Sequence, residues 1–330
     1  MFKRLLSVAV ALVLFAVLFP VFLNAAYAAE EALLAAAVEE AGNAREEAAP
    51  AGIDFRQKLN AIVTDMKRER QEQSAMAVEA YTRYMPSSGA HDMSGDVGVV
   101  DSAAEYSYAF KAFDKLPVQF GLKTKYIGVD NSTGVKLPAK MTGLTIGVET
   151  TFPFFKLDKT YVRVGAYPSF FGENWSMEAS TFRLPSRFFL IHEANDKLIL
   201  IAGVAVYPRF RQSVWPIAGF LYKPNDRLSF SITPERPNVS YKLSERLTVF
   251  AVADASYGEY EVKKDGRDNA ILQYKEYSLG TGLTYKLNNS VDITLDGGAA
   301  FNRYFKYRDS LGKVNVKNGG YVELRTEIKL

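Results

Sequence analysis

The chain has 330 residues, of which 48% are hydrophobic and 23% charged, with a formal net charge of +3 and no cysteine. These values exclude a collagen, a low-complexity tail and a disulfide scaffold. The near-neutral charge argues against a nucleic-acid-binding protein, which needs a concentrated basic face.

The N-terminus has the layout of a secretory signal peptide. Lys3 and Arg4 precede an almost continuous apolar run from residue 5 to 23, and Ala26-Tyr27-Ala28 offers small residues for cleavage. We expect cleavage after Ala28, with an uncleaved membrane anchor as the alternative. Either way, the rest of the chain crosses a membrane.

Residues 29–73 differ in composition from everything that follows, because they are rich in Ala, Glu, Arg and Gln and contain one aromatic residue, Phe55. The pattern predicts two helices, the first ending near Gly42 and the second starting near Asp54. This segment reads as a periplasmic tether, or alternatively as a plug or a helix that binds a periplasmic partner.

From residue 74 onward, apolar and polar residues alternate in segments of about ten, as expected for β-strands. In the last segment, Val322, Leu324 and Ile328 fall on one face, opposite Glu323 and Arg325. A soluble sandwich or lipocalin-like barrel would turn the apolar face inward, and a transmembrane barrel would turn it outward. The segment length and the aromatic residues near strand ends, such as 304–307, favour the transmembrane barrel.

The connections alternate between short and longer ones, which is typical of outer-membrane barrels with periplasmic turns and outer loops. Short turns lie near 114–117, 155–158, 195–197, 223–227, 244–246 and 288–290. The other set is mostly longer, near 87–100, 130–138, 172–179, 259–270 and 306–317, but two of its members, near 209–213 and at 234–237, are short. This alternation predicts about fourteen antiparallel strands over residues 74–330. Residues 228–233 and 238–243 are too short to span alone, so twelve strands and a partial hairpin are the alternative.

The polar face of the predicted strands carries both charges, which favours internal ion pairs that brace or partly block the lumen over a selective ring of one sign. The candidate lumen-lining residues are Glu79, Arg83, Glu105, Lys111, Lys123, Lys125, Glu149, Arg163, Glu276, Asp292, Asp296, Glu323 and Arg325.

Residues 216–287 resemble a bacterial family of predicted outer-membrane β-barrels that is described as a domain of unknown function. The residues that carry the resemblance include Gly219, Gly258 and the turn residues Lys223, Pro224, Asn225, Asp226, Pro234 and Pro237. The resemblance implies the barrel fold and no catalytic residues.

The C-terminal strand is similar to the signal that outer-membrane assembly machinery reads. The residues that match this signal are Tyr321, Leu324, Ile328 and Leu330. Leu330 stands where phenylalanine is usual in such signals. We therefore expect membrane lipid and the assembly machinery as partners, in the outer membrane of a Gram-negative-type bacterium.

The sequence offers little chemistry. His91-Asp92 falls in a predicted loop, and His192 has only Ser186 on its own strand face, six residues away. Gly280-Thr281-Gly282 opens no helix, so it is not a phosphate-binding loop. We expect no enzyme activity, no cofactor and no metal.

Two functions stay open. The protein is a small-solute pore with a partly blocked polar lumen, or a non-conducting structural or partner-docking barrel. A transporter of hydrophobic substrates or a lipid-active enzyme is less favoured, and a soluble secreted β-protein least.

Overall fold

The computed structural model describes residues 76–330 except 92, 113–115, 155–156, 212, 234–235, 265 and 309–310. The expected signal peptide and the 29–73 segment lie outside the described residues. Within the described residues, no helix is long and apolar enough to cross a membrane.

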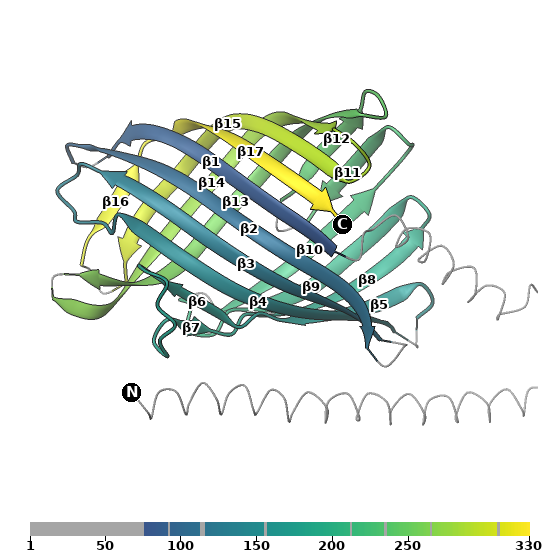
Figure 1. Ribbon diagram of the computed structural model, residues 1–330, viewed down its shortest axis with the longest axis horizontal. Coiled ribbons are helices and arrows are strands. Elements are labelled where there is room, and N and C mark those ends of the chain that lie inside the picture. The colour runs from purple at the N-terminus through teal and green to yellow at the C-terminus, as the bar shows by residue number, and fades with distance from the viewer. Residues whose placement is uncertain are drawn as a thin grey trace, which may run out of the picture. The chain divides into compact units, whose positions relative to one another are not determined.

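The described chain forms seventeen β segments, which Figure 1 labels along the chain. They are β1 (Met76–Gly89), β2 (Asp96–Ala112), β3 (Leu116–Asn131), β4 (Lys140–Pro153), β5 (Thr160–Ala166), β6 (Ser169–Gly172), β7 (Phe182–Arg183), β8 (Ser186–Asn195), β9 (Leu198–Val206), β10 (Val214–Tyr222), β11 (Leu228–Ile232), β12 (Asn238–Lys242), β13 (Leu247–Lys264), β14 (Arg267–Lys286), β15 (Val291–Tyr307), β16 (Lys313–Val316) and β17 (Gly319–Lys329).

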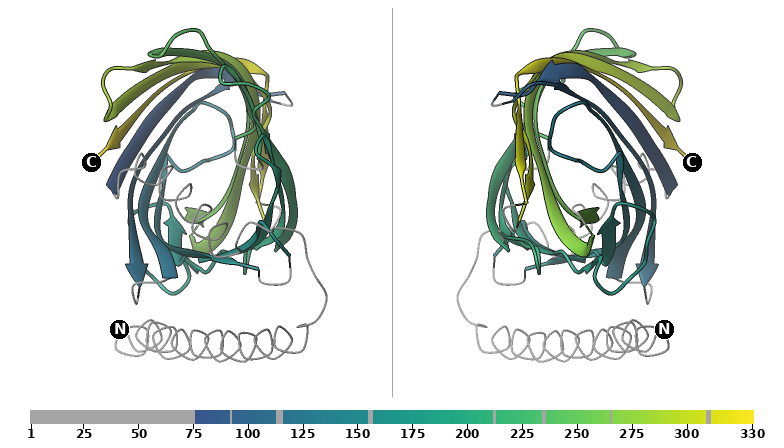
Figure 2. Two further views of the ribbon diagram at one scale, coloured as in Figure 1. Left: turned by 90° about the vertical axis from the view of Figure 1, so that its right-hand side faces the viewer. Right: turned by 90° about the vertical axis from the view of Figure 1, so that its left-hand side faces the viewer.

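The segments close into a barrel, because consecutive strands pair antiparallel and β17 returns to pair with β1 from Ala77↔Lys329 to Tyr84↔Val322. Short interruptions split three strands into β5 and β6, β7 and β8, and β16 and β17, so the seventeen segments make fourteen wall strands. The prediction of fourteen strands is therefore confirmed, and the short hairpin β11–β12 is part of the wall. Figure 2 shows the strands as a ring.

The two ends of the barrel differ. The short connections lie at one end, here called the turn end, where Leu330 N–H donates to the carbonyl of Met76 at 2.9 Å. The opposite end, here called the loop end, carries the longer connections and lies at the left of Figure 1.

The outer face of the wall is apolar. The register aligns Leu283, Leu295 and Leu324 on neighbouring strands, and all three are exposed. Their strand neighbours Asp296 and Glu323 point the other way and are buried. Pairing with neighbouring strands satisfies most of the backbone within the wall, as a bilayer requires. The fold is therefore a transmembrane antiparallel β-barrel and not a soluble sandwich.

The barrel narrows at the loop end. There β13 leaves β12 and forms a parallel bridge with β6 at Glu261↔Gly172, reinforced by Glu173 N–H donating to Glu261 O at 2.9 Å. The bridge bypasses the five wall strands between them, because β8 to β12 end earlier. At this level the ring consists of β1, β2, β3, β4, β6, β13, β14, β15 and β16. A ring of about eight strands is just wide enough for side chains to fill.

Apolar side chains fill this narrow ring, which we call the cap. The cap core comprises Met85, Ala90, Val97, Val99, Ile127, Val129, Met141, Tyr260, Val262, Ala270, Leu272, Tyr274, Ala300, Phe305, Tyr307, Val314, Val316 and Tyr321. Tyr274 and Phe305 stack with ring centroids 4.8 Å apart at its centre. The interior of the barrel is thus a packed core at the loop end.

The cap corrects two sequence expectations. Residues 259–270 are not a loop, because β13 and β14 continue through them and pair from Glu259↔Gln273 to Val262↔Ala270. Phe305 and Tyr307 do not belong to an interfacial girdle, because they are buried inside the cap. Both corrections have one cause: the alternation pattern does not distinguish residues that fill the cap from loop or lipid-facing residues.

Leu272→Ala tests the packing of the cap. Leu272 is fully buried, so its truncation leaves a cavity and we expect the free energy of unfolding to fall by about 2–5 kcal/mol. Urea unfolding in lipid vesicles, followed by tryptophan fluorescence, measures the change. The control Leu287→Ala, at a turn where the side chain is 53% exposed, should change stability by about 0.5 kcal/mol. Equal losses in the two variants would contradict a packed interior.

Candidate functional site

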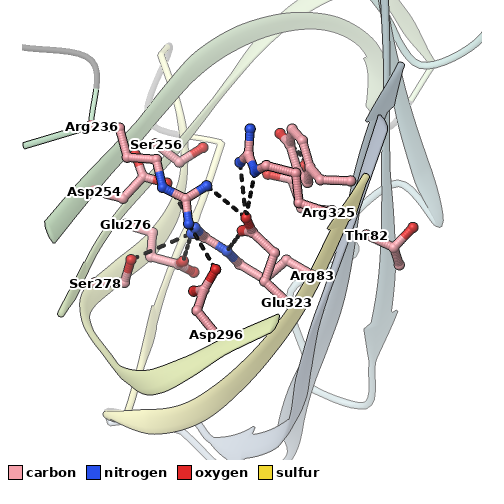
Figure 3. Close-up of polar contacts among 12 residues, drawn as sticks. Thr82, Arg83, Arg236, Asp254, Ser256, Glu276, Ser278, Asp296, Glu323 and Arg325 are labelled. Atoms are coloured by element: carbon pink, nitrogen blue, oxygen red, sulfur yellow. Dashed lines mark hydrogen bonds and ion pairs between the residues drawn. The ribbon is translucent and has the colours of Figure 1, made fainter. Parts of the chain in front are cut away.

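A network of buried charges lies in the interior on the turn-end side of the cap, and Figure 3 shows it. Glu323 of β17 is its centre. Its Oε2 accepts from Arg83 Nε at 2.7 Å, and its Oε1 accepts from Arg236 Nη1 at 2.7 Å and Arg325 Nη2 at 2.8 Å. The Glu323 side chain is 0% exposed. A buried carboxylate with three guanidinium donors has its desolvation offset by charge-assisted hydrogen bonds.

Arg83 extends the network across the interior. From β1 it reaches Asp254 of β13 at 2.7 Å and Glu276 of β14 at 3.5 Å, and its guanidinium lies 4.7 Å from the Tyr321 ring centroid. Arg303 of β15 in turn lies 3.3 Å from Glu276. The network thus joins strands from opposite ends of the sequence, and it occupies the lumen beneath the cap.

Arg236 enters the network from the tip of the short hairpin β11–β12. Its Nη2 donates to Asp296 of β15 at 2.8 Å, in addition to the bond with Glu323. Gly219 allows this approach, because a Cβ there would lie 2.4 Å from the carbonyl oxygen of Ile232, where the hairpin crosses it. Sequence reasoning missed Arg236, although an arginine between Pro234 and Pro237 was the available signal. Pro234 itself lies outside the described residues.

The register places the candidate lumen residues on the inward side of the wall. Six of them meet in the network: Glu79, Arg83, Glu276, Asp296, Glu323 and Arg325, with Glu79 bonded to Arg325. Lys125 lies beside the network, because it pairs at 3.2 Å with Asp101, which is buried and lies across from Arg83, and it contacts Ser256 at 3.4 Å. The others lie nearer the turn end, where Lys123 pairs with Glu105 at 3.1 Å, Asp292 with Lys329 at 3.0 Å and Arg163 with Thr151 at 3.1 Å. Glu149 lies across from Gln119 and Gly165, and Lys111 across from Pro117.

The inward-facing residues of the turn-end half line the part of the interior that we call the chamber. Side chains there keep much of their surface exposed: Glu79 42%, Glu105 42% and Lys123 44%. A small recess with room for about one water molecule lies among Glu79, Tyr81, Ala103, Glu105 and Lys123. Water therefore reaches the charged wall of the chamber.

Another part of the chamber wall is largely apolar, which sequence reasoning also missed. On β8, β9 and β10 the register sets Phe188, Leu200 and Phe220 outward, where they are exposed. The apolar residues that face inward and are half-buried are Phe189, Ile191, Ile199, Ile201, Ile217 and Leu221. Arg187 and Glu193 of β8 also face inward, and Glu193 lies across from Ile199. The signal was the loss of alternation in LILIAGVAV and WPIAGFLY, which have apolar residues on both faces.

The remaining sequence candidates have structural roles. In the 223–227 turn, Asn225 Oδ1 accepts from the backbone N–H groups of Arg227 and Leu228 at 3.0 and 2.9 Å, and Pro237 O accepts from Ala253 N–H at 2.9 Å. Gly280 permits close packing, since a Cβ would meet the Tyr321 hydroxyl at 2.3 Å. His192 Nδ1 and Thr160 Oγ1 share a hydrogen bond of 2.9 Å. No group of three metal-ligating side chains occurs in the described part of the chain.

At the C-terminus, Leu324, Ile328 and Leu330 lie on the outward face. Tyr321 faces inward, and the Arg83 guanidinium packs on its ring. Recognition of this strand by assembly machinery stays a prediction.

Glu323→Ala tests the network. The substitution leaves three guanidinium groups without their shared carboxylate, so we expect a loss of about 3–5 kcal/mol in unfolding free energy. Glu327→Ala is the matched control: it lies on the same strand and face, its side chain is 41% exposed, and its loss should be at most about 1 kcal/mol. Urea titration in vesicles measures both. A loss at Glu323 no larger than at Glu327 would show that the network contributes no stability.

Solved structures of outer-membrane barrels are similar to this chain at low identity. The COG4313 outer membrane channel from Pseudomonas putida F1 has a TM-score of 0.45 at 10% identity, over 78% of this chain and 95% of that one. Acinetobacter baumannii Omp33 has a TM-score of 0.37 at 9% identity, over 78% of this chain and 99% of that one. LpxR from Salmonella typhimurium has a TM-score of 0.36 at 8% identity, over 77% of this chain and 100% of that one.

Comparison with curated proteins found no match. One family model matches residues 161–326, half of the chain, and includes both the apolar wall and the network residues Arg236, Glu276 and Glu323. The chain belongs to the family described as domain of unknown function (DUF6268).

Proposed function

We propose that this outer-membrane barrel is closed to axial diffusion and works as a binding chamber that opens at its turn end. The observation that carries the proposal is the cap, where nine wall strands surround a packed apolar core. An open pore needs a continuous wet path, and the interior of a narrow ring filled with side chains offers none.

The buried network adds a second layer to the closure. Arg83 and Arg236 reach across the interior to carboxylates on β13, β15 and β17. Their charges are matched within the network, which makes them braces between strands and not free charges that select an ion. This arrangement supports the partly blocked lumen expected from the mixed charges.

The chamber has the character of a ligand site. One part of its wall carries the ion pair Lys123–Glu105, and another carries apolar side chains such as Ile199 and Ile217. Binding sites for small molecules combine an apolar lining with a few polar groups that fix orientation. With short turns on the periplasmic side, the chamber faces the periplasm.

Planar-bilayer conductance of the purified full chain tests the closure. We expect no steady current from the unmodified protein, because the cap blocks the axis. The double variant Tyr274→Ala/Phe305→Ala removes the stacked pair at the centre of the cap, and it should produce discrete current steps.

The control for this experiment is Tyr277→Ala/Phe301→Ala, a ring pair on the lipid-facing side of the same two strands with centroids 6.1 Å apart. This variant should show no current steps in the bilayer measurement. A steady current from the unmodified protein would reject the closed barrel and support the small-solute pore.

A further inference from the structure

The wall contains a gap above the short hairpin. β11 and β12 have five residues each, whereas β13 has eighteen. β10 pairs with β11 only through Phe220, Leu221 and Tyr222, and the pairing of β12 with β13 ends at Asn238↔Val252. In the described part of the chain, residues 214–219 of β10 and 254–260 of β13 therefore border the same sector with no strand paired between them.

Side chains close this gap, which we call the side window. Trp215 of β10 and Tyr257 of β13 face each other with ring centroids 6.1 Å apart, and Phe210 of the β9–β10 loop lies 6.2 Å from Tyr257. The loop is fixed where Arg211 N–H donates to Glu259 Oε1 at 2.9 Å. Side-chain contacts can separate by rotamer changes on a timescale far shorter than the breaking of a strand pair.

The side window has apolar surface on both sides. Outside it, Val214, Phe220 and Tyr222 are exposed on the lipid-facing side. Inside it, Ile217 begins the apolar wall that continues through Ile199 and Ile201 to β8. An apolar surface thus runs from the membrane to the chamber.

The hairpin β11–β12 borders the side window on the turn-end side, and contacts inside the barrel hold it in place. The backbone of Ile232 passes close to Gly219, and the Arg236 side chain at the hairpin tip is bonded to Glu323 and Asp296. The side chains of Arg236 and Arg325 are 22% and 23% exposed, whereas that of Arg83, which also bonds Glu323, is 4% exposed. The hairpin is the wall element with the fewest backbone pairs, so its position depends on this ion pair.

We propose that a single-chain amphiphile enters the chamber sideways from the membrane through the side window, and lies with its chain on the apolar wall and its polar head toward the charged wall. The inference rests on the proposed function, because only a barrel closed along its axis needs a lateral route. It names the ligand class and the path for that chamber.

Photolabelling tests the proposal with the full chain in phospholipid vesicles that contain a diazirine-bearing palmitic acid. Mass spectrometry of the digested protein locates the labelled residues. We expect labels on inward-facing Ile199, Ile201 and Ile217 in addition to outward-facing Leu200 and Phe220. Ile217→Asp should lower the labelling of Ile199 and Ile201 about tenfold, because a carboxylate replaces an apolar contact. Ala218→Ser, at the next residue on the lipid side, should leave it unchanged.

A cross-link tests the route. The chain has no cysteine, so Trp215→Cys/Tyr257→Cys provides two unique thiols across the side window, which a bifunctional methanethiosulfonate can join and a reductant can release. Joining should reduce inward labelling about tenfold, and release should restore it. The two single-cysteine variants, treated alike, are the controls.

The outcomes separate the two proposals. Labels confined to outward-facing residues would overturn the lateral entry of an amphiphile. Inward labels that persist in the cross-linked protein would overturn the side window and leave a chamber that fills from the turn end. Neither result bears on conductance, so the closed axis stands or falls on the bilayer measurement.

Discussion

Closure of one sheet at two different circumferences is the constraint on which the rest of this structure depends. At the turn end the ring includes all fourteen wall strands, and at the loop end the Glu261↔Gly172 bridge reduces it to nine. The narrow ring has to be filled, and the wide ring is left wet. The packed cap, the exposed charged wall and the early ends of β8 to β12 are three results of the same geometry.

The charged network occupies the level where the circumference changes. Above it, inward positions hold apolar residues such as Leu272 and Phe305, and below it they hold solvated pairs such as Lys123–Glu105. Arg83 and Glu323 are buried between the two environments, where neither core packing nor water would satisfy an isolated charge. Mutual pairing is the solution that this level permits.

Much of the fold could be predicted from the sequence, because lipid on one side and polar groups on the other impose a period of two. Leu324 and Glu323 are adjacent in the chain, and the first faces outward and is exposed while the second faces inward and is buried. The pattern did not reveal where the interior itself becomes apolar: Phe305 and Ile217 face inward, yet look like any lipid-facing residue. It also could not reveal Arg236, whose role depends on a hairpin tip crossing Gly219 and meeting strands far along the chain.

The bond between Arg83 and Glu323 joins the first and last strands of the barrel, 240 residues apart in sequence. It can form only when the final strand has arrived, since Glu323 belongs to β17 and β17 completes the ring by pairing with β1. Until then its charges keep their hydration, and the interior is open to water along the seam. Dehydration of this carboxylate therefore accompanies closure of the barrel between its first and last strands.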